Sequence, residues 1–313
     1  MMPVGCCEGR AKWVFVNLSS SECPDTAFQA VPAATSYSTL AGLITGFVFT
    51  GIILLIADRR QVENFFRLPT LIQFFAGFVS LGFSAYVFGL ISGEAPQACR
   101  RAWTAVAAAS GMLAVGVIAA VGGIVLLAIA YRPTGETDRI KTQLGMFRRL
   151  LRTSYILTAF ICAALLVGRN IEATWVWFGK DLWKIAVPLA MGLLVLGFGA
   201  ITVRAWRYDS STSRHHDRAP LAGSGDPDCQ HLLTGAMITV LYTLIAALLV
   251  GTALSLVNGD WGRAGPAWGL AATIAGTAAP LAAIWWFVRG VLGLVDAWPP
   301  PTTSPDPNKA PAD

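Results

Sequence analysis

The residues best suited to chemistry gather in one short segment, residues 169–184, which reads RNIEATWVWFGKDLWK. This segment holds two carboxylates, Glu172 and Asp181, together with the indole rings of Trp175 and Trp177. An aromatic mouth with two carboxylates would suit a cationic or amphiphilic ligand. It would also suit a general acid that acts on an isoprenoid-like substrate held in a bilayer. The simpler interpretation, which we favour, is an interfacial aromatic belt whose charged side chains reach toward water.

Metal and cofactor chemistry has little support in the sequence. His215, His216 and Asp217 lie in a linker-like segment near Cys229 and His231, but their spacing matches no zinc-binding pattern. The motifs HExxH, GxSxG and CxxC do not occur, and neither does a glycine-rich phosphate-binding loop with its lysine. We therefore expect no metal site and no cofactor, and no motif points to an enzyme class.

Charged side chains are nearly absent from the long apolar runs of the chain, which disfavours transport through a proton relay. Arg289 comes closest, and it is a candidate ligand-binding residue. We expect the last helix to end just before it, so that its side chain reaches the membrane surface. The alternative is a longer helix in which Arg289 pairs with Asp296.

Two prolines within apolar runs, Pro188 and Pro280, predict kinked helices, and a kink can open a cavity or a hinge. Gln73, Tyr86 and Tyr242 are the polar residues best placed to line such a cavity. Tyr242 is therefore a second candidate for ligand binding.

The composition shows which elements must position these residues. Of 313 residues, 55% are apolar and only 13% are charged, about half the charged fraction of a typical soluble domain. So few charges cannot cover the surface of a soluble globule, and so apolar a chain is not intrinsically disordered. The sequence thus predicts an integral membrane protein.

The fold class expected is all-α, a polytopic bundle of about seven transmembrane helices. Spanning a bilayer takes about 20 apolar residues, and the backbone must bond within each span. A bundle over 36–296 is flanked by a polar N-terminal tail, 1–35, and a proline-rich, disordered C-terminal tail, 297–313. The predicted spans are 37–57, 71–92, 105–130, 151–171, 185–203, 232–257 and 266–288.

The distribution of basic residues predicts the orientation of the bundle. With the N-terminus outside and the C-terminus inside, 15 of the 23 Lys and Arg residues fall on the inner side, as the positive-inside rule requires. Cys23 and Cys99 then face the oxidising side and can form a disulfide. Other pairings and free thiols remain open, and free thiols are the simpler expectation.

A basic amphipathic stretch precedes the fourth span. Lys141, Arg148, Arg149 and Arg152 lie mostly off its apolar stripe, an arrangement that favours an anchor on anionic lipid at the inner face. This inner face accounts for the net charge of +5, so we predict no nucleic-acid partner.

Small residues within the spans predict close helix packing. Gly42 and Gly46 form a GxxxG pair, which packs helices within one chain or joins two copies in a homo-oligomer.

Three functions agree with these features. The first, which we favour, is a non-enzymatic role in transport or permeation of a small molecule, and it predicts a hydrated cavity near Pro280, Pro188 and Tyr242. The second is a membrane-embedded enzyme acting on a lipid or isoprenoid through carboxylates among Glu94, Glu172, Asp181 and Asp260. The third is an accessory or signalling subunit. The 18 Arg against 5 Lys, with abundant Ala and Gly, are typical of a GC-rich genome, so we expect a bacterial cytoplasmic membrane protein.

Overall fold

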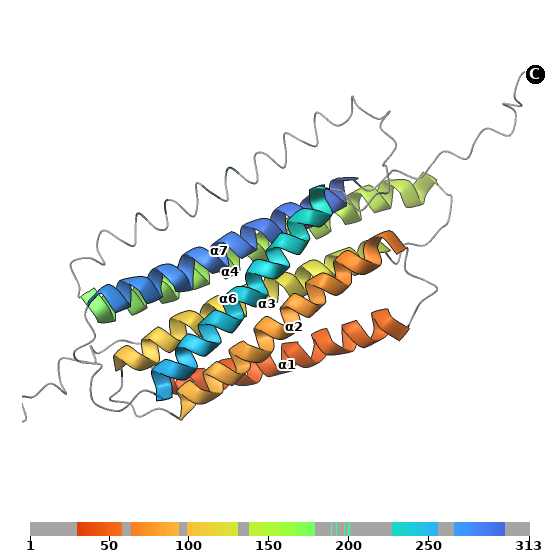
Figure 1. Ribbon diagram of the computed structural model, residues 1–313. Coiled ribbons are helices and arrows are strands. Elements are labelled where there is room, and N and C mark those ends of the chain that lie inside the picture. The colour runs from red at the N-terminus through yellow and green to blue at the C-terminus, as the bar shows by residue number, and fades with distance from the viewer. Residues whose placement is uncertain are drawn as a thin grey trace, which may run out of the picture.

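A computed structural model describes residues 30–57, 64–93, 99–130, 138–178, 227–255 and 266–297, with four isolated positions between 189 and 200. These ranges contain long α-helices and, within them, no strand (Figure 1). The helices are α1 (Ala30–Ala57), α2 (Asn64–Ser92), α3 (Cys99–Ala130), α4 (Asp138–Phe178), α6 (Pro227–Ser255) and α7 (Pro266–Ala297).

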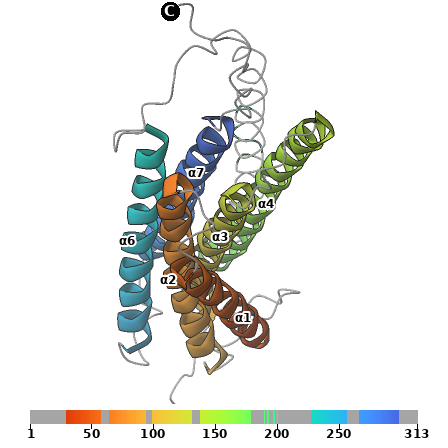
Figure 2. The same ribbon diagram turned by 90° about the vertical axis from the view of Figure 1, so that its right-hand side faces the viewer.

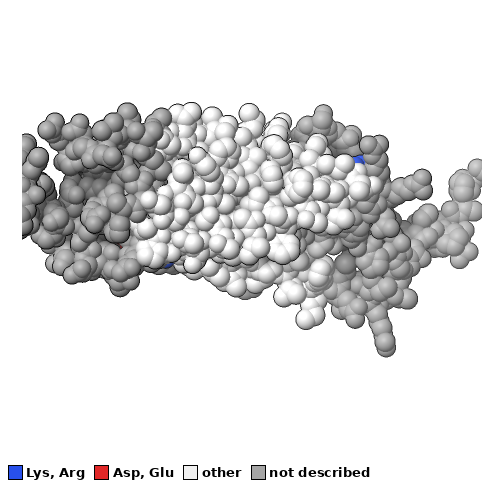
Figure 3. Space-filling view, turned by 90° about the horizontal axis from the view of Figure 1, so that it is seen from below, with Lys and Arg blue, Asp and Glu red and all other residues white. Residues whose placement is uncertain are grey.

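All six helices in the described ranges are long and apolar enough to cross a membrane. The predicted helical membrane bundle is thus confirmed, with six of about seven expected spans described. The expected fifth span, 185–203, lies outside the described residues apart from isolated positions. The described surface in Figure 3 is uncharged over a broad belt, with basic residues visible only near its two ends. Such a belt is what a hydrocarbon environment requires.

Helix α3 forms the centre of the bundle and contacts α1, α2, α4, α6 and α7. It is rich in Ala and Gly, so neighbouring backbones can approach it closely. A Cβ built on Gly77 of α2 would lie 3.2 Å from both the Gly116 carbonyl oxygen and the Ala120 nitrogen of α3. These small residues therefore fix the position of α2 against α3.

Helix α1 lies at the edge of the bundle beside α2, away from α7 (Figures 1 and 2). Only 17% of an 18-residue apolar stretch of α1 is buried, against 67% of the corresponding stretch of α3. Large side chains such as Leu43, Phe47 and Leu54 are exposed on α1. In a membrane this face of α1 is open to lipid or to a neighbouring chain.

Two predicted boundaries are corrected by longer helices. Helix α4 is continuous from Asp138 to Phe178, so the basic stretch, the fourth span and the start of segment 169–184 form one helix. Helix α7 continues to Ala297, so the expectation that it ends before Arg289 was wrong. The residues after Arg289 are apolar, and Val291, Leu294 and Val295 are buried in the bundle, which explains why the helix continues.

Helix α1 begins at Ala30, before the predicted end of the N-terminal tail at residue 35. Pro32 falls in the first turn of α1, where its missing N–H leaves no helical hydrogen bond unmade. Residues 1–29 and 298–313, which include most of both predicted tails, lie outside the described residues.

Candidate functional site

The carboxylate of Glu172 is held by a basic side chain of its own helix. Arg169 Nη1 donates a hydrogen bond to Glu172 Oε2 at 2.9 Å, and Arg169 Nη2 donates to the Tyr37 hydroxyl of α1 at 3.0 Å. The guanidinium carbon also lies 6.0 Å from the centre of the Tyr37 ring, which packs on Phe88 of α2. This cluster clamps α4 to α1 and α2 at one end of the bundle. Glu172 is therefore paired with a permanent positive charge.

The other residues singled out in segment 169–184 are not placed in detail. Trp175 and Trp177 belong to the last turns of α4, beyond the predicted end of the fourth span at residue 171. Their side chains lie outside the described residues. Asp181 lies outside them entirely, as do the side chains of Glu94 and Asp260.

A proline in α7 creates a backbone acceptor that another helix satisfies. Pro280 has no N–H to bond the carbonyl of Gly276, four residues earlier in α7. Asn170 of α4, which is buried, donates from Nδ2 to the Gly276 oxygen at 3.4 Å and to the Leu166 oxygen at 2.9 Å. The side chain of Asn170 thus takes the place of a missing helical donor.

The packing around Pro280 is tight. The Tyr242 hydroxyl donates to the Ala108 carbonyl oxygen at 3.2 Å. A Cβ built on Gly111 of α3 would overlap the Tyr242 hydroxyl oxygen and lie 2.8 Å from Cγ of Pro280. Close contact between α3, α6 and α7 therefore occupies the region where a cavity at Pro280 and Tyr242 was expected. Of the other expected cavity residues, Pro188 lies outside the described residues, Tyr86 is exposed and Gln73 is buried.

Three buried hydroxyl groups join α2, α3 and α6 through hydrogen bonds. Ser80 donates to the Met112 oxygen at 2.8 Å and accepts a hydrogen bond from Thr243 at 3.2 Å. Ser84 donates to the Ala109 oxygen at 3.1 Å. These groups are satisfied within the protein and cross-link the helices.

A second polar location is different, because its groups have no hydrogen-bond partner within the described part of the chain. Both side-chain polar atoms of Gln73 in α2 and the hydroxyl oxygen of Tyr155 in α4 are buried and unpartnered. They converge at Gly122 of α3. A Cβ built there would lie 3.1 Å from Tyr155 Oη, 3.3 Å from Gln73 Oε1 and 3.3 Å from a methyl carbon of Val291 in α7.

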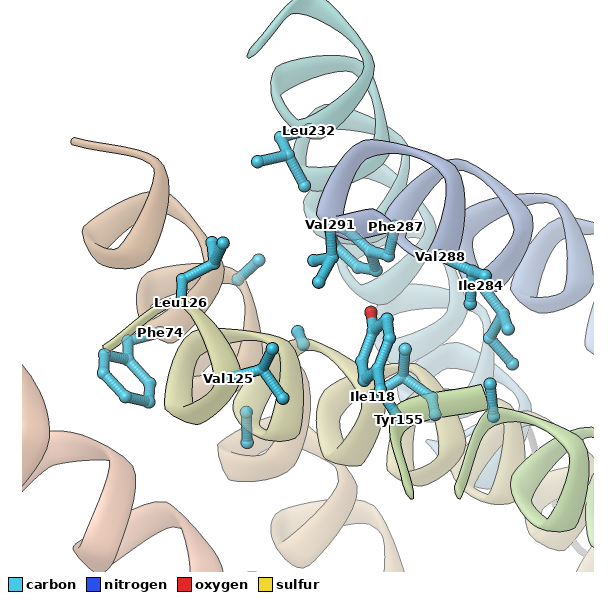
Figure 4. Packing of buried hydrophobic residues seen from close by; sticks show 14 of the residues in the cluster. Phe74, Ile118, Val125, Leu126, Tyr155, Leu232, Ile284, Phe287, Val288 and Val291 are labelled. Atoms are coloured by element: carbon cyan, nitrogen blue, oxygen red, sulfur yellow. The ribbon is translucent and has the colours of Figure 1, made fainter. Parts of the chain in front are cut away.

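Apolar side chains surround this location. The Tyr155 ring packs in a cluster with Ile118, Phe287 and Val291, and its hydroxyl points toward α7 near Val291 (Figure 4). We call Gln73, Tyr155 and the Gly122 backbone that both approach the interior polar site. The sequence singled out Gln73 and missed Tyr155 and Asn170.

Several of the remaining candidates are exposed in the described structure. Arg289 is exposed on α7, and the side chain of Asp296 lies outside the described residues. Gly42 and Gly46 are exposed on α1, with nothing within 4 Å of an added Cβ. The described structure thus gives them no packing role within the chain.

The basic stretch is described in part. Arg149 is exposed, whereas Arg148 and Arg152 are partly buried, and the side chain of Lys141 lies outside the described residues. The proposed Cys23–Cys99 disulfide is also outside them, since only the backbone of Cys99 is described. Within the described ranges, no three His, Cys, Asp or Glu side chains are grouped as a metal site would need.

The all-helical bundle and its uncharged belt define a multi-pass helical membrane protein. No protein-family model, curated protein or solved structure matches the chain.

Proposed function

We propose that this protein moves a small molecule across a membrane, by transport or permeation, and that the interior polar site contacts that molecule on its way. The observation that carries the proposal is the burial of Gln73 and Tyr155 without hydrogen-bond partners in the described structure. Each such group costs about 1–3 kcal/mol relative to an apolar replacement. A leucine and a phenylalanine would fill the same space without that cost. Polar groups that persist in a membrane interior typically serve a ligand or a pathway.

The wider setting of this proposal follows from the sequence. We propose a bacterial cytoplasmic membrane, with the N-terminus outside and the basic stretch on the inner face. The exposed guanidinium of Arg149 is available to anionic lipid headgroups there. We also propose that a homo-oligomer, if formed, uses the open face of α1 at Gly42 and Gly46.

A membrane-embedded enzyme is less well supported. A lipid-processing site of the kind considered needs two carboxylates converging on an apolar pocket. Glu172 is the one candidate carboxylate whose side chain is described, and it is paired with Arg169. We therefore favour transport or permeation over lipid chemistry, and no particular contact supports an accessory role.

The proposal is tested by flux into vesicles. The purified protein is reconstituted into proteoliposomes, and entry of glycerol, alanine, acetate, acetamidinium and acetamide is followed by stopped-flow light scattering. At least one solute should enter faster than into protein-free vesicles, and Gln73→Leu should slow that entry. Rates equal to those of protein-free vesicles for every solute would refute a transport role for these molecules.

A further inference from the structure

We infer that the interior polar site binds one small uncharged molecule that carries both a hydrogen-bond donor and an acceptor, and that α7 closes the site. This inference rests on the proposed function and specifies its substrate class. It follows from the chemistry of the two side chains, from the absence of buried charge in the described structure and from the position of Val291.

The hydrogen-bonding groups of the site are of both kinds. The Gln73 amide offers two N–H donors and one carbonyl acceptor, and the Tyr155 hydroxyl can donate or accept. Tyr155 Oη and Gln73 Oε1 lie on the same side of Gly122, each within 3.3 Å of the point where a Cβ would be. A ligand with a donor and an acceptor on adjacent atoms can therefore satisfy both side chains at once. Because Gly122 has no side chain, both polar groups can approach its backbone closely.

Within the described part of the chain, no charged side chain is buried beside the site. The buried polar side chains of the described residues are Thr70, Gln73, Ser80, Ser84, Asn170, Thr239 and Thr243, and none of them is charged. Placing an unpaired ion in such surroundings is far more costly than placing a neutral polar molecule. The site should therefore select against anions and cations of the same shape.

Helix α7 covers the site in the observed arrangement. A methyl carbon of Val291 lies 3.3 Å from the Gly122 Cβ position, so a ligand of several atoms enters only when α7 moves away. The part of α7 after Pro280 packs tightly on α6. A Cβ on Gly235 of α6 would lie 2.9 Å from Phe287 of α7, and a Cβ on Gly290 of α7 would lie 2.8 Å from Leu232 of α6. We therefore expect the part of α7 after Pro280 to move together with the part of α6 around Leu232 and Gly235.

The point about which α7 can bend is identified by its missing hydrogen bond. Pro280 interrupts the backbone bonding of α7 to Gly276, and prolines are the usual cause of helix kinks. Val291 lies 11 residues beyond Pro280, or about 16 Å along a helix at about 1.5 Å per residue. A bend of about 10° at Pro280 would shift Val291 by about 3 Å, which is enough to admit a small ligand beside Gly122.

The experiment uses three probes of nearly equal shape and different charge, namely acetamide, acetate and acetamidinium. Each is tested for entry into proteoliposomes containing the full chain, with protein-free vesicles as reference. Acetamide should enter faster than the reference, whereas acetate and acetamidinium should not. Gln73→Leu, Tyr155→Phe and Gly122→Ala should each reduce the protein-dependent acetamide rate about tenfold.

The matched control is Gly168→Ala. Gly168 lies in the same bundle on α4, and an added Cβ there has no atom within 4 Å, so acetamide entry should be unchanged. Equal entry of the three probes, or full activity of Gln73→Leu, would overturn the inference.

A binding measurement separates this inference from the proposed function. Acetamide should raise the midpoint of thermal unfolding of the wild-type protein in detergent, but not that of Gln73→Leu. A raised unfolding midpoint without acetamide entry into vesicles would support the ligand class and refute transport of acetamide. Flux of other solutes without an acetamide shift would leave the transport role standing and overturn this inference.

Discussion

The side-chain amide of Asn170 lies 3.4 Å from the carbonyl oxygen of Gly276, the acceptor that Pro280 leaves without its helical donor. The contact joins α4 to α7 at the point where α7 is weakest. A Cβ on Gly276 would lie 3.1 Å from Asn170 Oδ1, so the glycine is what lets the asparagine approach the α7 backbone. A proline, a glycine and an asparagine from two distant segments therefore form one structural unit.

Replacing Asn170 should destabilise the protein, because the Gly276 carbonyl in the interrupted helix α7 then loses this donor. Asn170→Leu removes the donors to Gly276 and Leu166, and we expect a loss of about 1–3 kcal/mol in the free energy of unfolding. Pro280→Ala restores a backbone donor to Gly276, so the cost of Asn170→Leu should be smaller in the Pro280→Ala background. Thermal or denaturant unfolding in detergent micelles of the wild type, the two single variants and the double variant measures this coupling. Additive effects of the two substitutions would show that Asn170 and Pro280 are not coupled.

Removing the unpartnered groups of the interior polar site should stabilise the protein. Gln73→Leu and Tyr155→Phe replace buried groups that have no hydrogen-bond partner in the described structure, so each should raise the free energy of unfolding by about 1 kcal/mol. Ser80→Ala provides the contrast, because Ser80 bonds Met112 and Thr243 and its loss should lower stability by roughly 0.6 kcal/mol or more. Thermal unfolding of the three variants checks this. A loss of stability in Gln73→Leu would assign that residue a structural role instead.

Two glycine-to-alanine substitutions should have opposite effects. A Cβ on Gly116 would lie 2.7 Å from Leu81 Cγ and 3.1 Å from the Leu81 nitrogen, so Gly116→Ala must separate α2 from α3 at a cost of about 1–3 kcal/mol. Gly46→Ala meets nothing within 4 Å and should gain up to about 1 kcal/mol from helix propensity. Unfolding of both variants at matched detergent concentration provides the comparison. A large loss for Gly46→Ala would point instead to a partner on the open face of α1.

The sequence predicted the class of the fold because a bilayer imposes strict requirements on composition. The absence of charge over long runs identified the helices, and each described helix includes most of its predicted span. Helix ends were less predictable. The charge of Arg289 predicted a helix end, yet its exposed side chain lies on a helix that continues because Val291 and Val295 are buried.

The interior polar site was predictable in part. Gln73 stands out as a polar residue in an apolar run, and the structure buries it. Tyr155 and Asn170 lie close to arginines at the ends of the fourth run, where polar residues are common, so no local pattern distinguished them. The link between Asn170 and Gly276 spans 106 residues of sequence. Such pairings depend on how helices pack, and the periodicity of the sequence does not predict them. A proline within a helix does indicate that one backbone carbonyl needs another donor.

The clamp formed by Arg169 should have two parts that differ in their response to salt. The bond to Glu172 is an ion pair with side chains 23% and 35% exposed, so it should contribute no more than about 0.5–1 kcal/mol. The bond to the Tyr37 hydroxyl involves one charge and one neutral group. Raising NaCl from about 0.05 M to about 1 M shortens the screening length to about 3 Å and should weaken chiefly the ion pair.

Unfolding of Arg169→Met, Glu172→Gln and Tyr37→Phe at both salt concentrations separates the two parts. Glu172→Gln should lower the free energy of unfolding at low salt but not at high salt. Tyr37→Phe should lower it at both concentrations, because a direct hydrogen bond is screened less. Arg169→Met should cost the most, since it removes both bonds and leaves the Glu172 carboxylate without this partner. If Tyr37→Phe had no effect at either concentration, the arginine would not clamp α1 through the hydroxyl, and α1 would be held by its packing on α2.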